Sequence, residues 1–238
     1  MSDLGAVEYR DHRAAASNVC FPEEAVDTPS KRMLRLGADA LQLCGVVRSG
    51  IQVLVGLADA QSVQFRGLTA LVRRVPFAPL AVEEREVAAY RAVVEGAFAE
   101  RTVLPARYGT VFRSRESLLR WLELHYFTLL DALRFLEGRQ MARVQIRSRL
   151  ADRSETEEQA DIEATALDSF RVLKRSAVAF LPYGARSGFY EASFLVERER
   201  WDAFGAALRE EERRLGHLRL HCSGPWPPYD FVRMELHG

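Results

Sequence analysis

The spacing of apolar residues changes several times along the chain, and this change constrains the fold more than any other feature. Between residues 41 and 72 the apolar residues fall in short β-rich runs of strand length. From Glu83 to Arg101 they recur every three or four residues, as they do on one face of a helix. Strand-like and helix-like segments follow one another to residue 236, which predicts an α+β fold with helices on one face of mostly antiparallel sheets.

A sheet is predicted at the beginning of this pattern. Residues 41–47 and 51–55 are two β-rich runs separated by Arg-Ser-Gly, the signature of a hairpin. Residues 68–72 should join the same sheet. The helix expected over residues 83–101 has an apolar face that would cover it.

A second helix and a closing strand should complete the first domain. Ser114 can cap the helix and Gly138 can end it, with a leucine-rich stripe between them. In residues 142–147, Val144 and Ile146 alternate with polar residues. This alternation predicts an edge strand with one solvated face.

The second half of the chain begins with a polar, highly charged stretch, residues 148–158, which few apolar contacts could cross. Within it, Ser154 and Glu157 form a capping box that starts a helix. The elements expected after that helix are a strand, a strand, a helix, a strand and a strand, at 177–181, 190–196, 197–215, 218–222 and 231–236.

Two domains and a leading extension follow from these elements. Residues 1–37 have scattered charges and no sustained apolar period, which predicts a poorly ordered extension. Residues 38–150 would form the first α+β domain. Residues 151–238 would form a smaller α+β domain that ends in a Gly-Pro-Trp-Pro-Pro-Tyr-Asp-Phe motif.

Charge and cysteine content limit which binding partners and which cell compartment fit this protein. Lys+Arg 33 against Asp+Glu 33 gives a net charge of +0, so a nucleic acid or an anionic membrane would need a local basic patch. The three cysteines are widely spaced and odd in number, unlike a disulfide framework. No run approaches the roughly 18 apolar residues of a membrane span, and no secretory signal is present. We expect a protein of the reducing cytoplasm without a membrane partner.

One local basic stretch supports an alternative function, that of a nucleic-acid-binding regulator. It contains five arginines: Arg139, Arg143, Arg147, Arg149 and Arg153. No aromatic residues interleave with them to stack on bases, and the acidic helix start that follows offers neutralising partners. Pairing within the molecule is therefore the default interpretation, and no nucleic-acid partner is expected.

Residue patterns for catalysis are missing from the sequence. There is no Gly-x-Ser-x-Gly elbow, no phosphate-binding Gly-x-x-x-x-Gly-Lys loop and no Gly-x-Gly-x-x-Gly fingerprint. His217 and His221 have a metal-like spacing, but on a strand they would lie about 13 Å apart, too far for one zinc ion. We predict no catalytic, cofactor-binding or metal-binding residues and no small-molecule substrate. An enzyme whose pocket carries no recognisable motif remains an alternative.

The most unusual segment lies near the carboxyl end, at Gly224-Pro-Trp-Pro-Pro-Tyr-Asp-Phe231. Its three prolines remove backbone donors and force extended geometry, so the segment is a stiff bend that presents Trp226 and Tyr229. Rigid aromatic side chains make good binding anchors. The alternative, at least as well supported by the physics, is that Trp226 plugs the core at a corner between strands.

Two segments resemble the gas vesicle protein F/L family. Its members carry a mid-chain Thr-Val-Leu-Pro-x-Arg-Phe-Gly-Thr-Val-Phe, which Thr102–Phe112 matches with Tyr108 in place of the first Phe. They end in Gly-Pro-Trp-Pro-Pro-Tyr-Ser-Phe-Val, and here Asp230 stands in place of Ser. The order and spacing of the motifs match over about Leu41–Leu236.

This resemblance implies two α+β domains, the first of them similar to a ferredoxin-like fold with its sheet covered by two helices. It also implies a non-enzymatic structural or accessory role in gas vesicle formation. The implied partners are the major gas vesicle shell protein and other gas vesicle accessory proteins, on vesicles assembled in the cytoplasm. The residues expected to contact them are aromatic or apolar: Pro105, Tyr108, Trp226, Tyr229 and Phe231.

Overall fold

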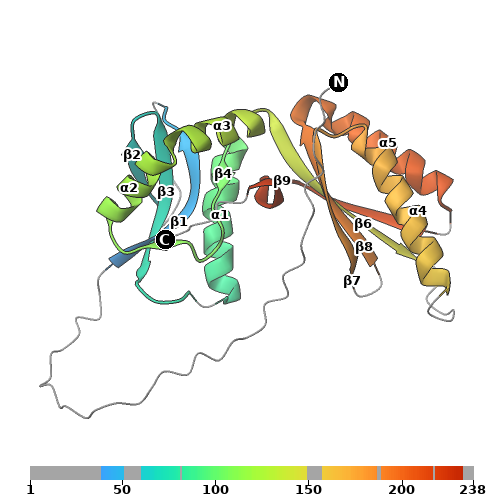
Figure 1. The fold of residues 1–238 in the computed structure, drawn as a ribbon, viewed down its shortest axis with the longest axis horizontal. Helices are drawn as coiled ribbons and strands as arrows, with labels where there is room; N and C mark the ends of the chain where they lie inside the picture. The colour runs from blue at the N-terminus through green and yellow to red at the C-terminus, as the bar shows by residue number, and fades with distance from the viewer. Residues whose placement is uncertain are drawn as a thin grey trace, which may run out of the picture. The chain divides into compact units, whose positions relative to one another are not determined.

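Two antiparallel sheets with covering helices make up the described part of the chain (Figure 1). The computed structural model describes residues 39–50, 60–80, 82–148, 157–186, 189–216 and 218–232, all of which belong to the contact unit Leu36–Gly238. The predicted α+β class is confirmed. The expected extension at residues 1–37 lies outside the described residues, and the predicted domain limits stay predictions.

The first sheet has the strand order β2-β3-β1-β4, and β5 also pairs with β1. Its strands are β1 (Asp39–Arg48), β2 (Ala60–Phe65), β3 (Leu68–Pro76), β4 (Leu104–Pro105) and β5 (Val111–Phe112). β3 joins β1 as predicted, in antiparallel register from Arg48↔Leu68 to Asp39↔Pro76. β2 was not predicted, and the expected hairpin strand at residues 51–55 lies outside the described residues.

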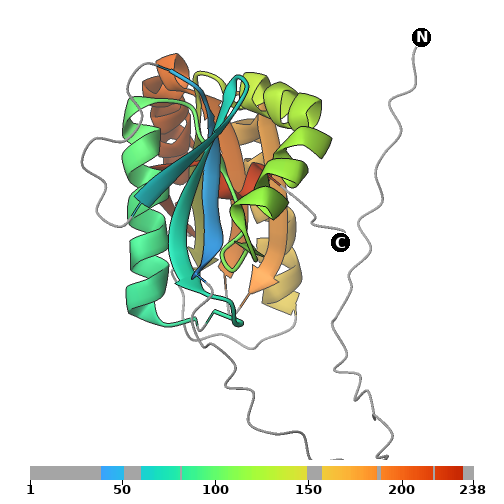
Figure 2. The same cartoon turned by 90° about the vertical axis from the view of Figure 1, so that its left-hand side faces the viewer.

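Helices cover both faces of this sheet: α1 (Glu84–Glu100) on one, α2 (Arg115–Leu124) and α3 (Tyr126–Leu136) on the other. Figure 2 shows the sheet between them. Alternate side chains of β1 explain this arrangement, because Leu41 and Leu43 join the α2–α3 side while Cys44 and Val47 join the α1 side. The core on the α2–α3 side is called cluster 1 and the core under α1 is called cluster 3.

The helix predicted between Ser114 and Gly138 is interrupted once. Ser114 caps α2 as predicted, through a box in which its hydroxyl accepts from the Ser117 N–H. His125 leaves the helical conformation and separates α2 from α3. The bend lets the leucine stripes of both helices reach the same core, cluster 1.

The second sheet has the order β7-β8-β6-β9, all antiparallel. Its elements are β6 (Arg139–Ser148), α4 (Glu157–Lys174), β7 (Ala179–Arg186), β8 (Phe189–Glu197), the short helix η1 (Arg198–Arg200), α5 (Trp201–Arg214) and β9 (Leu218–Trp226). Both α4 and α5 pack on one face and form cluster 2. This β-α-β-β-α-β order is the ferredoxin-like one. The ferredoxin-like order therefore occurs in the second half of the chain and not in the first half, where it was expected.

The strand predicted to close the first domain belongs to the second sheet instead. β6 pairs with β8 on one side and β9 on the other, so the prediction of an edge strand is wrong. Val144 and Ile146 are buried under α4 and α5, whereas Arg143 and Gln145 point to the face that carries no helix. An internal strand of a sheet covered on one face alternates just as an edge strand does, which explains the error.

The end of the described chain returns to the first half. After β9, the short helix η2 (Tyr229–Phe231) occupies the place where a strand was predicted from Phe231, and residues 233–238 lie outside the described residues. Phe231 and Val232 pack against cluster 1, and Tyr229 packs against cluster 3. Arg198 adds a hydrogen bond from its Nη2 to the Phe98 carbonyl, at 3.1 Å. None of the helices in the described ranges has the length and apolar content that a membrane span requires.

Candidate functional site

The proline-rich segment, Ser223–Val232, forms a tight corner between the second sheet and the first half of the protein; it is called the corner below. Gly224 has φ +134°, a conformation that side chains other than glycine rarely adopt. A Cβ at this position would lie 2.7 Å from the Met141 carbonyl oxygen and 3.1 Å from the Trp201 ring. The corner is therefore held closely against β6 and the beginning of α5.

Four of the five predicted contact residues are built into the protein interior or its margin. Pro105 is buried in β4, opposite Gly45 of β1. Tyr108 and Tyr229 are partly buried against cluster 3, and Phe231 is partly buried against cluster 1. The structure thus brings Tyr108 and Tyr229 to one cluster, while Phe231 lies on another.

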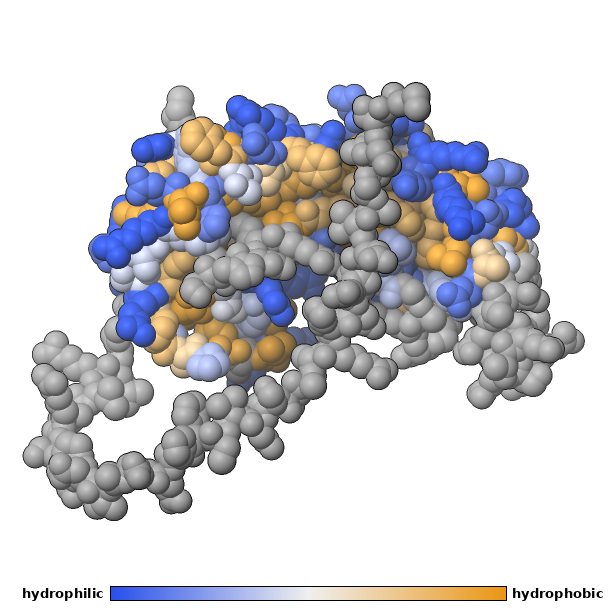
Figure 3. Space-filling view, viewed as in Figure 1, coloured by the Kyte–Doolittle hydropathy of each residue, from blue (hydrophilic) through white to orange (hydrophobic). Residues whose placement is uncertain are grey.

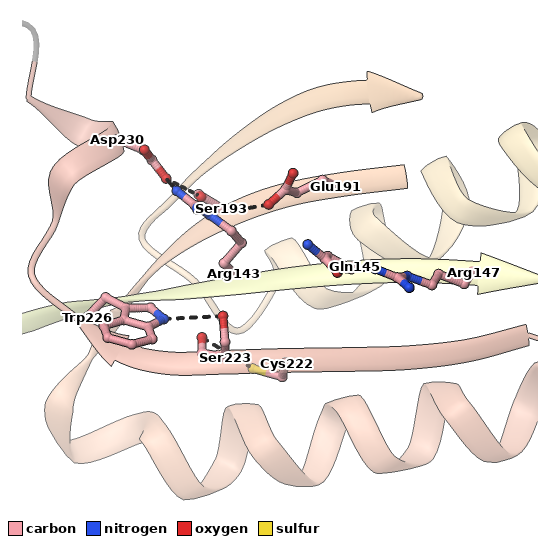
Figure 4. A network of polar contacts seen from close by, with 9 residues as sticks. All are labelled: Arg143, Gln145, Arg147, Glu191, Ser193, Cys222, Ser223, Trp226 and Asp230. Carbon is pink, nitrogen blue, oxygen red and sulfur yellow. Dashed lines mark hydrogen bonds and ion pairs between the residues drawn. The ribbon is translucent and has the colours of Figure 1, made fainter. Parts of the chain in front are cut away.

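Trp226 differs from the other three aromatic contact residues because it joins none of the three clusters formed by the described residues. Its indole is partly exposed and its Nε1 donates to the Ser223 Oγ at 3.2 Å (Figure 4). The Arg91 guanidinium of α1 lies 5.5 Å from its ring centroid, and Arg91 also pairs with Glu95 at 3.1 Å. The ring is therefore partly exposed and is held by polar and cation–π contacts outside the three clusters.

A network of charged and hydroxyl groups lies beside the corner on the helix-free face of the second sheet (Figure 4). Arg143 donates from Nη2 to the Asp230 carboxylate at 2.7 Å, and its Nε lies 3.3 Å from the Glu191 carboxylate. The Ser193 hydroxyl donates to the same Asp230 oxygen at 2.6 Å. The two hydrogen bonds to Asp230 tie the corner to β6 and β8; they are part-buried and charge-assisted.

This network was not predicted from the sequence. Arg143 was noted only as one of five arginines in a basic stretch. Ser193 lies in no sequence motif that would indicate a role. Asp230 offered a clue, since it replaces the serine of the family motif and brings a charge that needs a partner. The other described arginines of that stretch are engaged too, with Arg139 over Phe135 and Arg147 over Phe189.

The nucleophilic side chains near the corner are held protonated. Burial raises the pKa of the Cys44 thiol to about 12 and that of the Tyr183 hydroxyl to about 12. Burial also raises the pKa of Tyr90 and Tyr229 above the usual range for tyrosine. A nucleophile or general base needs a pKa matched to the working pH, and these groups are shifted away from it.

Within the described residues, no three His, Cys, Asp or Glu side chains lie close enough together to hold a metal ion. His221 is exposed on β9, and His217 lies outside the described residues.

We expect Cys222 to react slowly with iodoacetamide. Its side chain is exposed, but partial desolvation of the sulfur between β9 and α5 raises the pKa of the thiol to about 11, so at pH 8 its thiolate fraction is roughly a hundredfold or more below that of a free cysteine. Alkylation followed by mass spectrometry, in a Cys20→Ser background, should give a rate that rises about tenfold per pH unit from pH 8 to 10. Fast labelling that is independent of pH would contradict the assignment.

Comparisons with known proteins agree with this fold. The model of the family described as "Gas vesicle synthesis protein GvpL/GvpF" matches residues 43–166 and 139–233. Gas vesicle protein F1 of Halobacterium salinarum is 25% identical over 78% of this chain and 87% of its own length. Gas vesicle protein F of Haloferax mediterranei is 26% identical over 84% and 96%.

Solved structures show the same architecture. The crystal structure of gas vesicle protein GvpF from Anabaena sp. PCC7120 superimposes with a TM-score of 0.69 at 21% identity, covering 83% of this chain and 99% of that one. GvpF from Microcystis aeruginosa gives a TM-score of 0.64 at 17% identity, covering 82% and 99%. Because the family model spans most of the sequence and the fold agrees, the chain belongs to the GvpL/GvpF family of gas vesicle synthesis proteins.

Proposed function

We propose that this protein is a non-catalytic structural or accessory component of gas vesicle formation, assembled in the cytoplasm, that binds the major shell protein or other gas vesicle proteins through the corner. The observation that carries the proposal is Trp226, an aromatic side chain fixed at the surface and outside every core cluster of the described residues. A tryptophan that is already immobilised loses little entropy when a partner covers it.

The remaining predicted contact residues would support Trp226 at the site. Tyr229 and Phe231 anchor the corner to the first half, and Pro105 and Tyr108 lie in the segment under α1 that receives it. Tyr108, Tyr229 and Phe231 keep part of their surface exposed, so each can add to a contact centred on Trp226. Pro105 is buried and would act only by holding β4 in place.

Other exposed apolar side chains support a role in protein contacts. Leu124 is 79% exposed and Phe127 is 76% exposed, on either side of the bend at His125. Hydrophobic side chains are visible over α3 in Figure 3. Neighbouring exposed apolar residues of this size often mark a surface that a partner covers.

Replacing Trp226 with alanine should abolish or sharply reduce vesicle formation while the protein stays folded. Loss of a tryptophan at the centre of an interface costs at least about 2 kcal/mol, or roughly thirtyfold in affinity. The test is expression of the variant within a complete gas vesicle gene cluster, with vesicles scored by flotation and electron microscopy. Arg171→Ala, which changes an exposed residue of α4, is the matched control and should form vesicles normally.

Circular dichroism and thermal unfolding of the purified variant separate a docking defect from misfolding. A folded Trp226→Ala protein that supports normal vesicles would show that docking does not depend on the corner. Equal loss in the Arg171→Ala control would show that the assay does not report on this surface.

A further inference from the structure

We propose that the outer edge of β9 binds an extended segment of a partner protein as an added strand. β9 is the last strand in the order β7-β8-β6-β9, and no strand within the described ranges pairs with its outer side. An unpaired edge presents backbone N–H and C=O groups that a second extended chain can complete. The inference rests on the proposed function only for the identity of the partner.

The register shows which backbone groups of β9 point outward. Arg198 N–H donates to the Gly138 carbonyl, so the even-numbered residues of β6 face β8 and the odd-numbered ones face β9. Arg143 pairs with Ser223, and the ladder continues through His221 and Arg219. The alternate residues, Leu220 and Cys222, therefore direct their N–H and C=O groups away from the sheet.

An independent hydrogen bond agrees with this direction. Leu218 belongs to the same alternate set as Leu220, and its N–H donates outside the sheet, to the Leu215 carbonyl at 2.7 Å. Leu218 is thus satisfied by the end of α5, while the donors and acceptors of Leu220 and Cys222 are the ones available to a partner strand.

The opposite edge of the sheet is protected and β9 is not. β7 carries Pro182, which has no N–H to donate, and its pairing with β8 shifts register between Pro182 and Gly184. Proline and bulges are the usual means of blocking an edge strand. β9 has a regular register with β6 from Leu218 to Ser223, and its proline comes only at Pro225.

A groove beside the outer edge of β9 would receive side chains of the added strand. It measures about 230 Å³ and is lined mainly by apolar residues of α5 and β9, among them Trp201, Phe204, Leu208, Leu220 and Cys222. Small-molecule sites are usually roughly 300–1,000 Å³, so this groove is better suited to individual side chains. An added strand would place every second side chain into it, and those side chains should be apolar.

The other face of the same edge favours an acidic partner residue. Arg219 stands directly opposite Arg147 in the β6–β9 register, and like charges in this position destabilise a sheet. Arg147 is hydrogen-bonded to Gln145 and lies over Phe189, whereas Arg219 makes no ion pair with the described residues. The partner chemistry that fits is an extended segment with apolar side chains toward α5 and a carboxylate beside Arg219.

The edge leads directly to Trp226, since β9 ends at that residue. A strand added along Leu220 and Cys222 and continued by a few residues would reach the indole. The edge of β9 and Trp226 would then form one continuous contact surface. Backbone pairing at the edge would fix the register of the partner strand, and burial of Trp226 would add affinity.

The test uses the full chain co-expressed with the major gas vesicle shell protein as the probe, and compares Cys222→Pro with Cys222→Ser. Proline removes an outward N–H and obstructs an added strand without breaking the pairing to β6. Serine changes the thiol but keeps the N–H. We expect co-purified shell protein to fall roughly tenfold or more with proline and to stay within about twofold with serine. Arg219→Glu should also weaken capture, because it would repel an acidic strand.

Hydrogen exchange on the unmodified protein gives a second readout, independent of how well the proline variant folds. The amides of Leu220 and Cys222 should exchange quickly in the free chain and become protected in the complex. If the complex forms but these amides stay unprotected, or Cys222→Pro captures as much as Cys222→Ser, the edge proposal is wrong and the proposed function stands. If the unmodified chain captures no shell protein, both proposals fail for this partner.

Discussion

Alanine at position 224 should lower the free energy of unfolding by at least about 3 kcal/mol. A φ of +134° costs a side-chain-bearing residue roughly 1–3 kcal/mol. The added Cβ would also approach the Met141 carbonyl oxygen to 2.7 Å, and that oxygen belongs to the backbone of an internal strand and cannot move aside cheaply. Urea denaturation of Gly224→Ala, followed by circular dichroism, measures the loss.

Gly216→Ala is the matched control for this experiment. A Cβ at Gly216 meets nothing within 4 Å, and this glycine does not have the positive φ found at Gly224. Its free energy of unfolding should stay within about 0.5 kcal/mol of the starting protein. Equal stability of the two alanine variants would show that the corner is not held as closely as the structure indicates.

Replacing Arg143 with methionine should also lower the free energy of unfolding, by less than Gly224→Ala. It keeps the aliphatic stem but leaves the Asp230 and Glu191 carboxylates, 19% and 11% exposed, without the cation that they share. Breaking a buried pair in this way costs about 3–5 kcal/mol. Because Arg143 is itself 39% exposed, solvent screening should reduce the loss to roughly 2 kcal/mol.

A double-mutant cycle isolates the Arg143–Asp230 contribution. Asp230→Ser installs the residue of the family motif, and in the background of Arg143→Met it removes one uncompensated carboxylate. The two changes together should cost at least about 1 kcal/mol less than the sum of the single changes. Arg147→Met, on the same strand but exposed, should change stability by under about 0.5 kcal/mol. Strict additivity in the cycle would mean that the ion pair contributes nothing to holding the corner.

Much of the fold could be predicted from the sequence because its helices and buried strands follow regular apolar periods. α1 falls where the three-to-four period placed it, and β8 appears at Phe189–Glu197 where a buried run was expected. β2 was missed because its sequence, Ala-Gln-Ser-Val-Gln-Phe, has few apolar residues and buries only Val63 fully. Its place is set by pairing with β3, which local sequence does not report.

The assignment of strands to sheets could not be predicted from the same patterns. β6 shows the alternation of a half-buried strand whether it lies at an edge or in the middle, so its true neighbours, β8 and β9, were not evident. For the same reason the ferredoxin-like order was attached to the wrong half. Long-range pairing decides such questions, and a single sequence carries little information about it.

The candidate site was predicted in part. The proline pattern predicted a bend, which the structure has between β9 and η2, and the aromatic residues of this bend differ in their packing. Tyr229 and Phe231 lie against cores, while Trp226 lies outside them. The edge of β9 gave no sequence signal, because whether a strand has a neighbour depends on the rest of the sheet.

The packing of Phe231 and Val232 on cluster 1 bears on how the protein is made. Most of that core comes from β1 to α3, so a ribosome has produced its strands and helices long before the residues that complete it. Part of the apolar surface of the first half therefore stays exposed to solvent until residue 232 has left the ribosome. Domains usually fold as units during synthesis, and a half left open in this way is a natural client for a chaperone or for an early-binding assembly partner.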